Sequence, residues 1–504
     1  MPGLKLCILA AGKGTRIAAH SNVPHKALIP LQGKAVISHI LEKFSKDMEV
    51  VVALGYEAAL LREYLEAAHP DRKFQFVQVQ NYASPGSGPG QSLLECQPFL
   101  TSPFVLACAD TLWEENLAFH PERNQIFVAT ANSDLSEKYC NVLYTAKGEI
   151  TEIRDKVRVG RDAQFASFIG LATISDAELF FEGLTKNSEL IAGELQISSG
   201  FQALVAKRGC TAVKVNSWLD TGCVEGLQLA ERKFGTAFFK KRSEETYFVG
   251  SRVIKFYADS EICRMRILRS LQDQDILPPC VYSGNNFYAY TFIPGTAIRD
   301  LPSIVSFEEL LQFAKQFIWK KRENPADRHE LCRKFYIEKT KQRLELFREQ
   351  TDTVLFSRLE NMFSLWKMEE FLEKASLARF HGDFQVGNII STEAAPHFAL
   401  IDFRQEFAGR TDLGDIYYDL GKLFASIWID FISLAKAKTV EELHPKPHFA
   451  SLAKSIEDFA KAEKLDFLHI KKMALLIYLN MIGLHEKQTS EVLAHKLLEL
   501  NEQI

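Results

Sequence analysis

The sequence predicts two domains of different fold class, an α/β domain followed by an α+β domain. Residues 3 to about 235 alternate short apolar or β-branched runs with helix-like patterns, which is typical of a mostly parallel, mixed sheet with helices on both faces. A charged stretch at residues 236–245 predicts a connection. Short strands follow it, and the chain is mostly helical after Pro302, so we expect a small strand-rich lobe joined to a large helical lobe.

These patterns also give domain boundaries. We place the first domain at residues 1–235 and the second at 246–504, with a small lobe at about 246–300 and a helical lobe at about 301–504. Strands are predicted at residues 4–10, 49–54, 74–80, 104–109, 246–249, 253–257 and 287–292. Helices are predicted at residues 36–44, 58–67, 308–321, 329–348, 356–375 and in the stretch after 420. Ser306 and Glu309 form a capping-box pattern that predicts a helix start.

The composition excludes several classes of protein. Of the 504 residues 47% are hydrophobic, which is too many for an intrinsically disordered chain. Sixty basic against 64 acidic side chains give a formal net charge of −4, whereas a dedicated nucleic-acid binder would carry a basic excess. We therefore expect small-molecule partners and no nucleic acid. The oligomeric state stays open.

Cysteine usage and apolar runs predict a location. The nine cysteines form no Cys-x-x-Cys pair and no metal-binding spacing, which favours a reducing compartment. The apolar run at residues 4–11 passes directly into a glycine-rich segment, which favours a core strand over a signal peptide. A later apolar run, around residues 473–484, is too short for a membrane span and contains Asn480. We expect a cytoplasmic protein without membrane insertion.

The first predicted strand ends in a glycine-rich loop, Ala10-Ala-Gly-Lys-Gly-Thr-Arg16. Glycines let a backbone approach a phosphate, and a following helix N-terminus would offer unpaired N–H groups. The nucleotide-binding residues we expect here are Ala11, Gly12, Gly14 and Thr15, to which Arg16 adds a fixed charge. The spacing is not that of a Walker A loop, which needs Gly-Lys-Ser/Thr after four intervening residues. It is not a dinucleotide fingerprint either, because Ile17 fills the third glycine position. By itself the loop is equally compatible with a structural turn.

The segment that follows carries a family resemblance. Pro24-His-Lys-Ala-Leu-Ile-Pro-Leu-Gln-Gly-Lys-Ala-Val-Ile37, after Gly-Lys-Gly-Thr-Arg16, resembles the signature of the sugar nucleotidyltransferase (nucleotidyl-sugar pyrophosphorylase) family. The chain departs from that signature by inserting His25 into the Pro-Lys pair and by placing Ala35 where proline is usual. The resemblance implies a Rossmann-like fold, with Arg16 and Lys26 as catalytic residues that bind the triphosphate.

Two aspartates continue the resemblance. Asp110 ends the buried run Phe104-Val-Leu-Ala-Cys-Ala-Asp, and Asp220 lies in Trp218-Leu-Asp-Thr-Gly222. In the family these segments hold Mg²⁺, and a hard cation of this kind prefers carboxylate and phosphate oxygens. We therefore predict that Asp110 and Asp220 are metal ligands. The alternative for each is a purely structural role as a helix-capping aspartate.

Weaker signals lie between these segments. Gly88, in the glycine-rich stretch 84–94, occupies the place where the family contacts the nucleobase. By the same resemblance Asn141, Gly170 and Glu194 would touch the sugar, and Lys156 would meet the acceptor phosphate. Each of these residues also has an ordinary surface or turn explanation.

The second half contains a more specific motif, His381-Gly-Asp-Phe-Gln-Val-Gly-Asn388 followed by Leu400-Ile-Asp402. It resembles the aminoglycoside phosphotransferase/choline kinase family, whose members share the protein-kinase-like fold. The resemblance implies that Asp383 accepts the proton of the acceptor hydroxyl, and that Asn388 and Asp402 hold Mg²⁺ on the ATP phosphates.

Supporting residues flank this motif. Lys255, on a predicted strand, is the expected partner of the ATP phosphates, although no complete glycine-rich loop precedes it. Asp419 is expected to tie the catalytic loop. Arg404 follows the metal aspartate in Asp-Phe-Arg, where choline kinases usually carry aromatic and acidic residues. We predict that Arg404 binds substrate, because its charge would repel a cation and suit a polyol or a phosphate.

The two resemblances predict a bifunctional transferase. A small-molecule kinase would phosphorylate a sugar with ATP, and a nucleotidyltransferase would then join the sugar phosphate to a nucleotidyl group from a second NTP, with Mg²⁺ at both sites, giving an NDP-sugar for a surface glycan. One alternative is a choline kinase fused to a phosphocholine cytidylyltransferase that makes CDP-choline. Others are a non-catalytic regulator that binds nucleotides and sugars, and two halves with unrelated substrates. The sequence leaves open the sugar, the phosphorylated carbon, the second NTP and channelling between domains.

Overall fold

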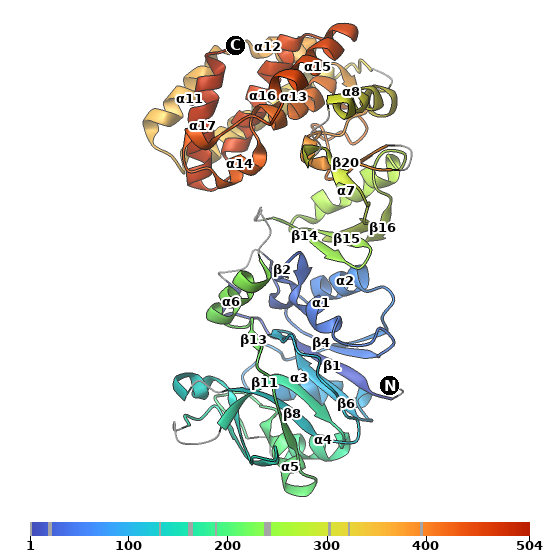
Figure 1. The fold of residues 1–504 in the computed structure, drawn as a ribbon, viewed down its shortest axis with the longest axis vertical. Helices are drawn as coiled ribbons and strands as arrows, with labels where there is room; N and C mark the ends of the chain where they lie inside the picture. The colour runs from blue at the N-terminus through green and yellow to red at the C-terminus, as the bar shows by residue number, and fades with distance from the viewer. Residues whose placement is uncertain are drawn as a thin grey trace. The chain divides into compact units, whose positions relative to one another are not determined.

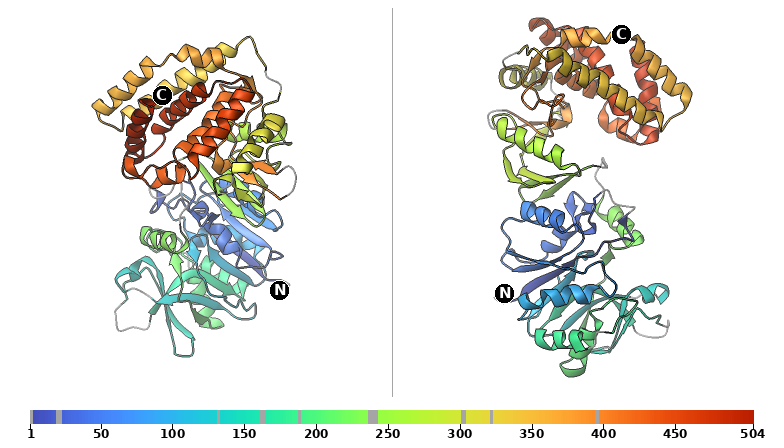
Figure 2. Two further views of the ribbon diagram at one scale, coloured as in Figure 1. Left: turned by 45° about the horizontal axis from the view of Figure 1, so that its top comes forward. Right: turned by 180° about the vertical axis from the view of Figure 1, so that it is seen from behind.

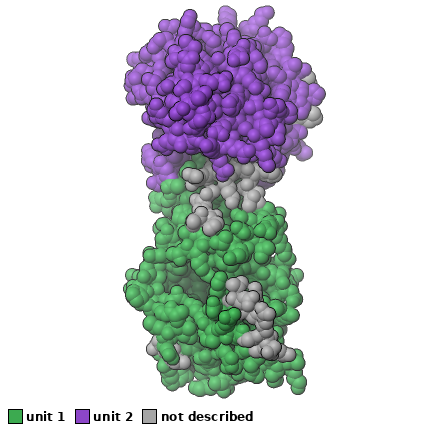
Figure 3. Space-filling model, turned by 90° about the vertical axis from the view of Figure 1, so that its left-hand side faces the viewer, with its two compact units in different colours: residues 1–258, 282–289 green, residues 259–281, 290–504 purple. Residues whose placement is uncertain are grey.

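The structure is a computed structural model of the 504-residue chain, and it divides into two compact units. Unit 1 comprises residues 1–258 and 282–289, and unit 2 comprises residues 259–281 and 290–504 (Figure 3). The residues that the structure describes are 3–18, 23–130, 133–159, 165–186, 189–235, 243–300, 304–320, 323–393 and 397–504. Most of the predicted connection, residues 236–242, lies outside them.

The main sheet of unit 1 begins with four parallel strands. Strand β1 (Lys5–Ala10) pairs in parallel with β4 (Val50–Leu54) and β6 (Phe104–Cys108), and β4 pairs in parallel with β5 (Phe74–Gln78). The predicted strands are confirmed to within two residues at each end. Because the strands are parallel, their carboxyl ends share one edge of the sheet, where ligands of such sheets bind.

The rest of this sheet is largely antiparallel, so the sheet is mixed as expected. The long strand β11 (Phe165–Ile174) pairs antiparallel with β6, β8 (Gln125–Thr130) and β9 (Cys140–Tyr144). Beyond them lie β10 (Ile150–Asp155), antiparallel to β9, and β12 (Thr211–Lys214), parallel to β8. Two-stranded sheets are formed by β2 (Pro30–Leu31) with β3 (Lys34–Ala35), and by β7 (Thr111–Leu112) with β13 (Leu219–Asp220).

Helices cover both faces of the main sheet (Figure 1). Alternate residues of β1 enter different cores, because side chains of a strand point to opposite faces. Leu6 and Ile8 pack with helices α1 (Val36–Leu41) and α2 (Ala58–Ala68). Cys7 and Leu9 pack with the helices of the other face, which are α3 (Pro89–Cys96), α4 (Ala177–Lys186) and α5 (Ser198–Lys207). Helix α6 (Val224–Phe234) follows β13 and adds Leu227 to the first core.

The core of unit 1 continues into the predicted small lobe. Strands β14 (Glu244–Val249), β15 (Arg252–Tyr257), β17 (Phe287–Thr291) and β16 (Cys280–Ser283) form a sheet in that order. Tyr247 of β14 is fully buried and meets Tyr64 of α2 edge to face, at 4.9 Å between ring centroids. Its hydroxyl donates to the carbonyl of Leu28 at 2.8 Å. The compact unit thus extends beyond residue 235, and the domain boundary stays a prediction.

Unit 2 is mostly helical, as expected (Figure 2). Helix α16 (Phe467–Ile482) packs against α13 (Ile416–Trp428), α17 (Lys487–Asn501) and α10 (Lys339–Arg348). The other helices are α7 (Ser260–Gln272), α8 (Ile304–Phe313), α9 (Arg328–Cys332), α11 (Thr353–Leu365), α12 (Met368–Lys374), α14 (Phe431–Lys436) and α15 (Phe449–Ala462), with π-helical turns at Ala314–Ile318 and Arg333–Glu338. Short strands β18 (Thr296–Ala297), β20 (Ile389–Ser391) and β21 (Phe398–Leu400) form one small sheet, and β19 (Leu377–Ala378) pairs with β22 (Gly414–Asp415).

Two local predictions are wrong. Helix α8 begins at Ile304, so Ser306 lies inside the helix and not at the N-cap that the capping-box pattern predicted. The predicted helix at 356–375 is two helices, because the chain leaves the helical conformation at Trp366, which takes an extended backbone with ψ of 131°. Local sequence patterns determine neither the start of α8 nor the break at Trp366, because tertiary packing determines where a long amphipathic segment bends.

Two further predictions concern cysteines and membranes. All nine cysteines are free thiols, and most are buried, which agrees with the apolar runs that contain them. Among the described residues, no helix has both the length and the apolar character that crossing a membrane requires.

Candidate active sites

The first candidate site lies at the carboxyl end of β1. The chain leaves the strand at Ala10 and forms the predicted glycine-rich loop, where Gly14 has a φ of 63°. A Cβ on Gly14 would lie 3.2 Å from the side chain of Lys26, so the glycine allows loop and lysine to approach closely. The helix N-terminus expected after the loop stays a prediction, because Ala18 begins a 3₁₀ helix and the residues directly after it are not described. A turn at Thr15–Ile17 is found there, and residues 19–22 lie outside the described part.

Lys26 forms an ion pair across the edge of the sheet. Its Nζ lies 2.5 Å from Oδ2 of Asp110, which follows β6. Although burial lowers the pKa of Lys26, the Asp110 carboxylate raises it overall, so the ammonium stays charged. Burial likewise raises the pKa of Asp110, but the charges of Lys26 and Arg16 lower it overall. The structure therefore brings together the predicted catalytic lysine, the predicted catalytic arginine and a predicted metal ligand.

His25, the residue inserted into the family's Pro-Lys pair, holds this arrangement in place. The imidazole is fully buried, and its Nε2 donates to the carbonyl of Ala10 at 3.0 Å. Its Nδ1 accepts from the backbone N–H of Ala27 at 3.1 Å. These two bonds require the neutral tautomer protonated at Nε2. Burial lowers the pKa of His25 to about 4, which keeps the ring neutral.

The Trp-Leu-Asp-Thr-Gly segment docks on the segment that contains Asp110. Strand β13 pairs antiparallel with β7, so that Asp220 lies opposite Thr111. The indole Nε1 of Trp218 donates to the Thr111 hydroxyl at 3.1 Å. Both the backbone N–H and the hydroxyl of Thr221 donate to the carbonyl of Asp110 at 2.9 Å. Tryptophan and threonine thus fix Asp220 beside Asp110, although 110 positions separate the two in the sequence.

The carboxylates of both aspartates lie against Gly222, where no room is left for a side chain. A Cβ on Gly222 would lie 2.5 Å from Oδ2 of Asp110 and 3.0 Å from Oδ1 of Asp220. Burial and the charge of Asp110 raise the pKa of Asp220, because two close carboxylates repel each other. Two neighbouring carboxylates are oxygen ligands suited to Mg²⁺. The described residues contain no cluster of three or more His, Cys, Asp or Glu that could hold a metal, so phosphate oxygens or water would complete the shell.

The residues predicted to touch the sugar lie in different surroundings. Lys156 pairs with Glu194 at 3.0 Å, so these two predicted residues are brought together. Gly88 packs on the same segment, since a Cβ there would lie 2.5 Å from the carbonyl of Leu195. Asn141 is fully buried and donates to the carbonyls of Ser136, Tyr139 and Val157, which stabilises the local chain. Its sugar contact stays a prediction.

Gly170 lies on β11, behind the Asp110 segment. It has a φ of 82°, and a Cβ would lie 2.9 Å from the Cβ of Cys108. The neighbouring Ile169 carbonyl accepts a hydrogen bond from the hydroxyl of Thr111. Only glycine allows this approach of β11 to the end of β6 without strain. Gly170 thus supports the position of Asp110, and its contact with a sugar stays a prediction.

The second candidate site lies in unit 2, in the loop that follows β19. Asp383 accepts from Nδ2 of Asn388 at 3.0 Å through Oδ2, and its Oδ1 lies 2.9 Å from Nζ of Lys422. Burial lowers the pKa of Lys422, but Asp383 raises it overall, so the lysine stays charged. Because Nδ2 of Asn388 donates to Asp383, the amide oxygen is the acceptor that this side chain offers to other groups.

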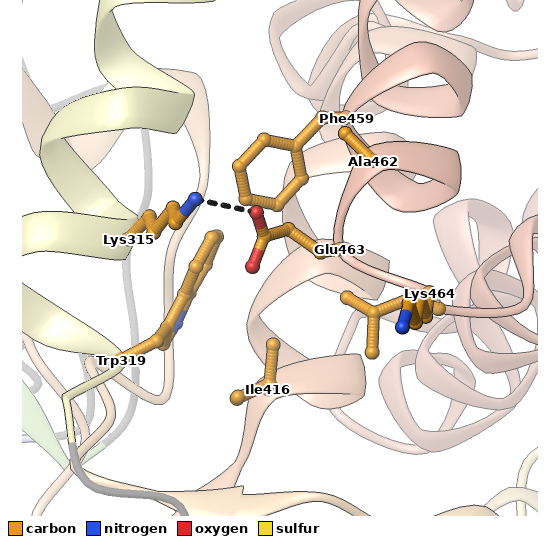
Figure 4. A pocket seen from close by; sticks show the side chains of 8 residues that line it. Lys315, Trp319, Ile416, Phe459, Ala462, Glu463 and Lys464 are labelled. Atoms are coloured by element: carbon orange, nitrogen blue, oxygen red, sulfur yellow. Dashed lines mark ion pairs between the residues drawn. The ribbon is translucent and has the colours of Figure 1, made fainter.

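Asp419 anchors this loop, as expected. Its two carboxylate oxygens accept from the backbone N–H groups of His381 and Gly382, at 2.8 and 2.7 Å. One of these oxygens also accepts from the indole Nε1 of Trp319 at 3.0 Å. Trp319 lines a pocket of 410 Å³ whose wall includes the Lys315–Glu463 ion pair (Figure 4). This pocket lies behind the anchor and contains none of the predicted site residues.

The remaining predicted residues of the kinase-like site are also placed. The backbone N–H of Ile401 donates to the carbonyl of Asn388 at 2.9 Å, so the segment of Asp402 runs beside the catalytic loop, and Asp402 has a φ of 54°. The backbone N–H of Arg404 donates to the carbonyl of His381 at 3.0 Å. Lys255 of β15, in unit 1, is buried, and its Nζ donates to the hydroxyl of Thr246 at 3.0 Å.

Sequence reasoning missed three residues of these sites. Tyr139 donates its hydroxyl to Oδ2 of Asp220 at 2.9 Å and meets the ring of Trp218 edge to face. Burial raises the pKa of the Tyr139 hydroxyl, which therefore stays protonated as a donor. The other two are His25 and Lys422. The insertion of His25 into a family motif was a visible signal, whereas a single tyrosine or lysine far from its partner gives none.

Two family models match separate parts of the chain. Residues 6–132 match the family model described as the MobA-like NTP transferase domain, and residues 243–441 match the model described as the phosphotransferase enzyme family. The chain therefore combines a nucleotidyltransferase domain with a kinase-like phosphotransferase domain.

Relatives of known name match the first part of the chain. The UTP–glucose-1-phosphate uridylyltransferase AglF of Haloferax volcanii is 24% identical over 244 residues, which are 46% of this chain and 96% of that protein. The bifunctional protein GlmU of Methanocaldococcus jannaschii is 23% identical over 217 residues, 43% of this chain. The chain spans about half the length of that relative, 50%. The solved structure of a UDP-glucose pyrophosphorylase complexed with UDP-glucose aligns with a TM-score of 0.39 and 20% identity, over 46% of this chain and 98% of that one.

Proposed function

We propose that the protein phosphorylates a sugar with ATP and then transfers a nucleotidyl group from a second NTP to the sugar phosphate, releasing pyrophosphate. The observation that carries the proposal is that, in each domain, the acidic side chains expected at the active site lie close to the residues expected to act with them. Asp110 and Asp220 both lie beside Gly222, and Asp383 is oriented by Asn388. A kinase product is a phosphate ester, and a nucleotidyltransferase consumes a phosphate ester, so the two reactions follow one another chemically.

In the nucleotidyltransferase domain the residues would hold the reacting phosphates in place and neutralise their charge. A phosphate oxygen of the sugar phosphate attacks the α-phosphate of the NTP, and the bond to pyrophosphate breaks. Lys26 and Arg16 would bind the phosphates as negative charge moves to the leaving group. Mg²⁺ held between Asp110 and Asp220 would supply further charge neutralisation. Lys156 and Glu194, which pair at 3.0 Å, would bind the sugar phosphate and the sugar.

In the kinase-like domain Asp383 would act on the acceptor. Its carboxylate accepts the proton of the sugar hydroxyl as the oxygen attacks the γ-phosphate of ATP, and ADP leaves. Asn388 keeps the carboxylate oriented, and Asp419 keeps the loop in place. Asn388 and Asp402 would hold Mg²⁺, which neutralises the phosphates. Lys255 would bind the ATP phosphates.

Further parts of the proposal concern ligands and location. We propose ATP and a second NTP as nucleotide substrates, Mg²⁺ at both sites, and the sugar or its phosphate as the other partner. The nine free thiols support a reducing compartment such as the cytoplasm. We propose that the NDP-sugar serves surface-glycan synthesis, and that the domain boundary lies between residues 235 and 246. Gly88 and the loop Ala11–Thr15 would bind the second NTP.

The test is mass spectrometry of products made by the purified full chain from ATP, Mg²⁺, the other NTPs and a panel of sugars plus choline. A parallel reaction uses Asp383→Asn. We expect an NDP-sugar from the native chain, its loss in the variant, and its return when the sugar phosphate is added. CDP-choline as the product would replace the proposal with its closest rival. Absence of any metal-dependent nucleotide turnover would indicate a regulator that only binds ligands.

A further inference from the structure

Basic side chains gather beside Asp383 in unit 2. Lys339 and Arg343 lie on α10, Arg404 lies in the segment after Asp402, and Lys422 lies on α13. Three separate elements thus contribute cations to one place.

Two cations of this cluster contact the aromatic ring of Phe335. Nζ of Lys339 lies 4.0 Å from the centroid of the Phe335 ring, and Cζ of Arg404 lies 4.9 Å from the same centroid. The ring is itself fixed, because Phe407 stacks on it at 4.1 Å and Tyr418 meets it edge to face at 5.0 Å. Two cations on one rigid aromatic ring are therefore held close together, although they repel each other.

The cluster carries more positive than negative charge. Arg404 has Glu406 at 3.8 Å, and Lys422 has Asp383 at 2.9 Å. Within the described residues, neither Lys339 nor Arg343 has a carboxylate within ion-pair distance. Burial, followed by the charges of Arg404, Lys422 and Arg343, lowers the pKa of Lys339 well below its ordinary value. This arrangement costs free energy in the free protein, and an anion would relieve it.

The cluster is adjacent to the reacting group. A Cβ on Gly382, the residue before Asp383, would lie 2.5 Å from the Cβ of Arg404. Lys422 bridges the two parts, because it contacts Asp383 and also lowers the pKa of Lys339 by its charge. A molecule whose hydroxyl reaches Asp383 would therefore extend over these cations.

We propose that the acceptor of the kinase-like domain is a hydroxylated small molecule that carries an anionic group, a carboxylate or a phosphate, held by Lys339, Arg343 and Arg404. This rests on the proposed kinase function and names the class of its substrate. The hydroxyl oxygen forms a bond to the γ-phosphorus of ATP, its proton passes to Asp383, and ADP leaves, while the anionic group takes no part in the reaction. A cationic acceptor such as choline would meet the same cluster with like-charge repulsion.

The first experiment measures ADP release by the full chain with matched acceptors, which are glucose, glucuronate, glucose 6-phosphate and choline. We expect kcat/KM for an acidic acceptor to exceed that of neutral glucose by about ten- to a hundredfold, the range of a charge-assisted hydrogen bond. Lys339→Met and Arg404→Gln should raise KM for the acidic acceptors, so that their kcat/KM falls to about that of glucose. Lys341→Met, an exposed lysine on the same helix, should leave it unchanged. Glucuronate and glucose 6-phosphate tell a carboxylate from a phosphate.

The second experiment keeps the proposal testable if none of these acceptors reacts. Inorganic phosphate is titrated by calorimetry into the full chain, Lys339→Met and Lys341→Met. If only Lys339→Met binds phosphate more weakly, the result supports an anion site, whether or not the chain shows kinase activity. Absence of kinase activity would refute only the proposed function. Equal binding by all three proteins overturns the anion site. Preference for glucose or choline, or a rise in KM for ATP in place of KM for the acceptor, would also overturn it.

Discussion

Nζ of Lys26 lies 2.5 Å from Oδ2 of Asp110, and 84 residues of sequence separate the two. The pair lies at the carboxyl edge of the sheet, where the loop after β1 meets the segment after β6. Only 17% of the Lys26 side chain and 15% of the Asp110 side chain are exposed, so each charge depends on the other in the free protein. If a triphosphate and a cation bind here as proposed, the lysine would pair with the phosphates and the carboxylate with the cation, so neither charge would be left unpaired.

Lys26→Met tests this exchange. The variant removes a cation that would stabilise charge on the phosphates, so we expect nucleotidyl transfer to fall by about 10²- to 10³-fold in kcat/KM. Phosphorylation of the sugar, measured on the same preparation, is the control and should be unaffected. A loss smaller than about threefold would contradict the role of Lys26.

Gly222→Ala tests the proposed metal site at the two aspartates. The new methyl group would lie 2.5 Å from Oδ2 of Asp110, where a cation is expected, so something must shift. We expect loss of nucleotidyl transfer and a rise in the Mg²⁺ concentration needed for half-maximal rate. Circular dichroism and kinase activity check that the chain is folded. Unchanged Mg²⁺ dependence would show that Asp110 and Asp220 do not bind the metal.

Asp419→Ala tests the anchor of the kinase loop. The backbone N–H groups of His381 and Gly382 would lose their acceptor in a buried site, at a cost of about 1–3 kcal/mol for each unsatisfied group. We expect sugar phosphorylation to be lost while nucleotidyl transfer to added sugar phosphate continues. Asp419→Asn, which keeps an amide oxygen as an acceptor, should retain more activity. Equal phosphorylation by the native chain and Asp419→Ala would contradict the anchoring role.

His25 gives a prediction about pH. Its pKa is about 4 in the folded chain, against 6.5 for an ordinary histidine, so the unfolded chain binds a proton that the folded chain does not between these values. Stability from this residue is present above pH 6.5 and is lost as pH falls towards 4, by up to about 3 kcal/mol. Urea titrations at pH 7.5 and pH 5 measure the loss.

The control for this titration is a comparison of histidine variants. His25→Asn should lower stability at pH 7.5 but flatten the loss between pH 7.5 and 5. His120→Asn, which replaces an exposed imidazole, should keep the slope of the native chain. The same pH slope in His25→Asn and in the native chain would mean that His25 is not the buried neutral group described here.

Tyr247 tests the shared core of unit 1. Although it lies in the segment that matches the phosphotransferase family, it is buried against Tyr64 and Leu28 of the nucleotidyltransferase domain. Tyr247→Ala should lower the free energy of unfolding by about 3–5 kcal/mol, and Tyr247→Phe, which loses only the hydrogen bond, by about 1 kcal/mol. Loss of nucleotidyl transfer on urea titration reports the unfolding. Equal midpoints for native and alanine proteins would contradict a common core.

Sequence patterns predicted much of this fold because the signals are local. An apolar run such as Val50–Leu54 is a buried strand wherever it lies in the sheet, and a motif such as residues 381–388 contains its own spacing. Asp110 and Asp220 could also be predicted from the sequence, because each ends or lies within a recognisable segment. Failures occurred where the outcome depends on distant packing, as at Ser306, which lies inside α8.

Other features of the site could not be read from the sequence for the same reason. Tyr139 becomes a partner of Asp220 only because β13 pairs with β7, and Lys339 joins Arg404 only because both pack on Phe335. The continuation of the first core into β14 was equally hidden. A tyrosine at position 247 in an alternating strand indicates burial but does not say against which element.

The central claim is that the two reactions are consecutive, and isotopic labelling tests it most directly. The full chain is given ATP labelled with ¹⁸O in the γ-phosphoryl group, unlabelled second NTP, Mg²⁺ and the free acceptor, and the nucleotidyl product is weighed by mass spectrometry. We expect the label in the phosphate attached to the acceptor, including the oxygen that bridges to the nucleotidyl phosphorus, and no label in the non-bridging oxygens of the nucleotidyl phosphate. A nucleotidyl product without label, or labelled acceptor phosphate that is never converted, would contradict it.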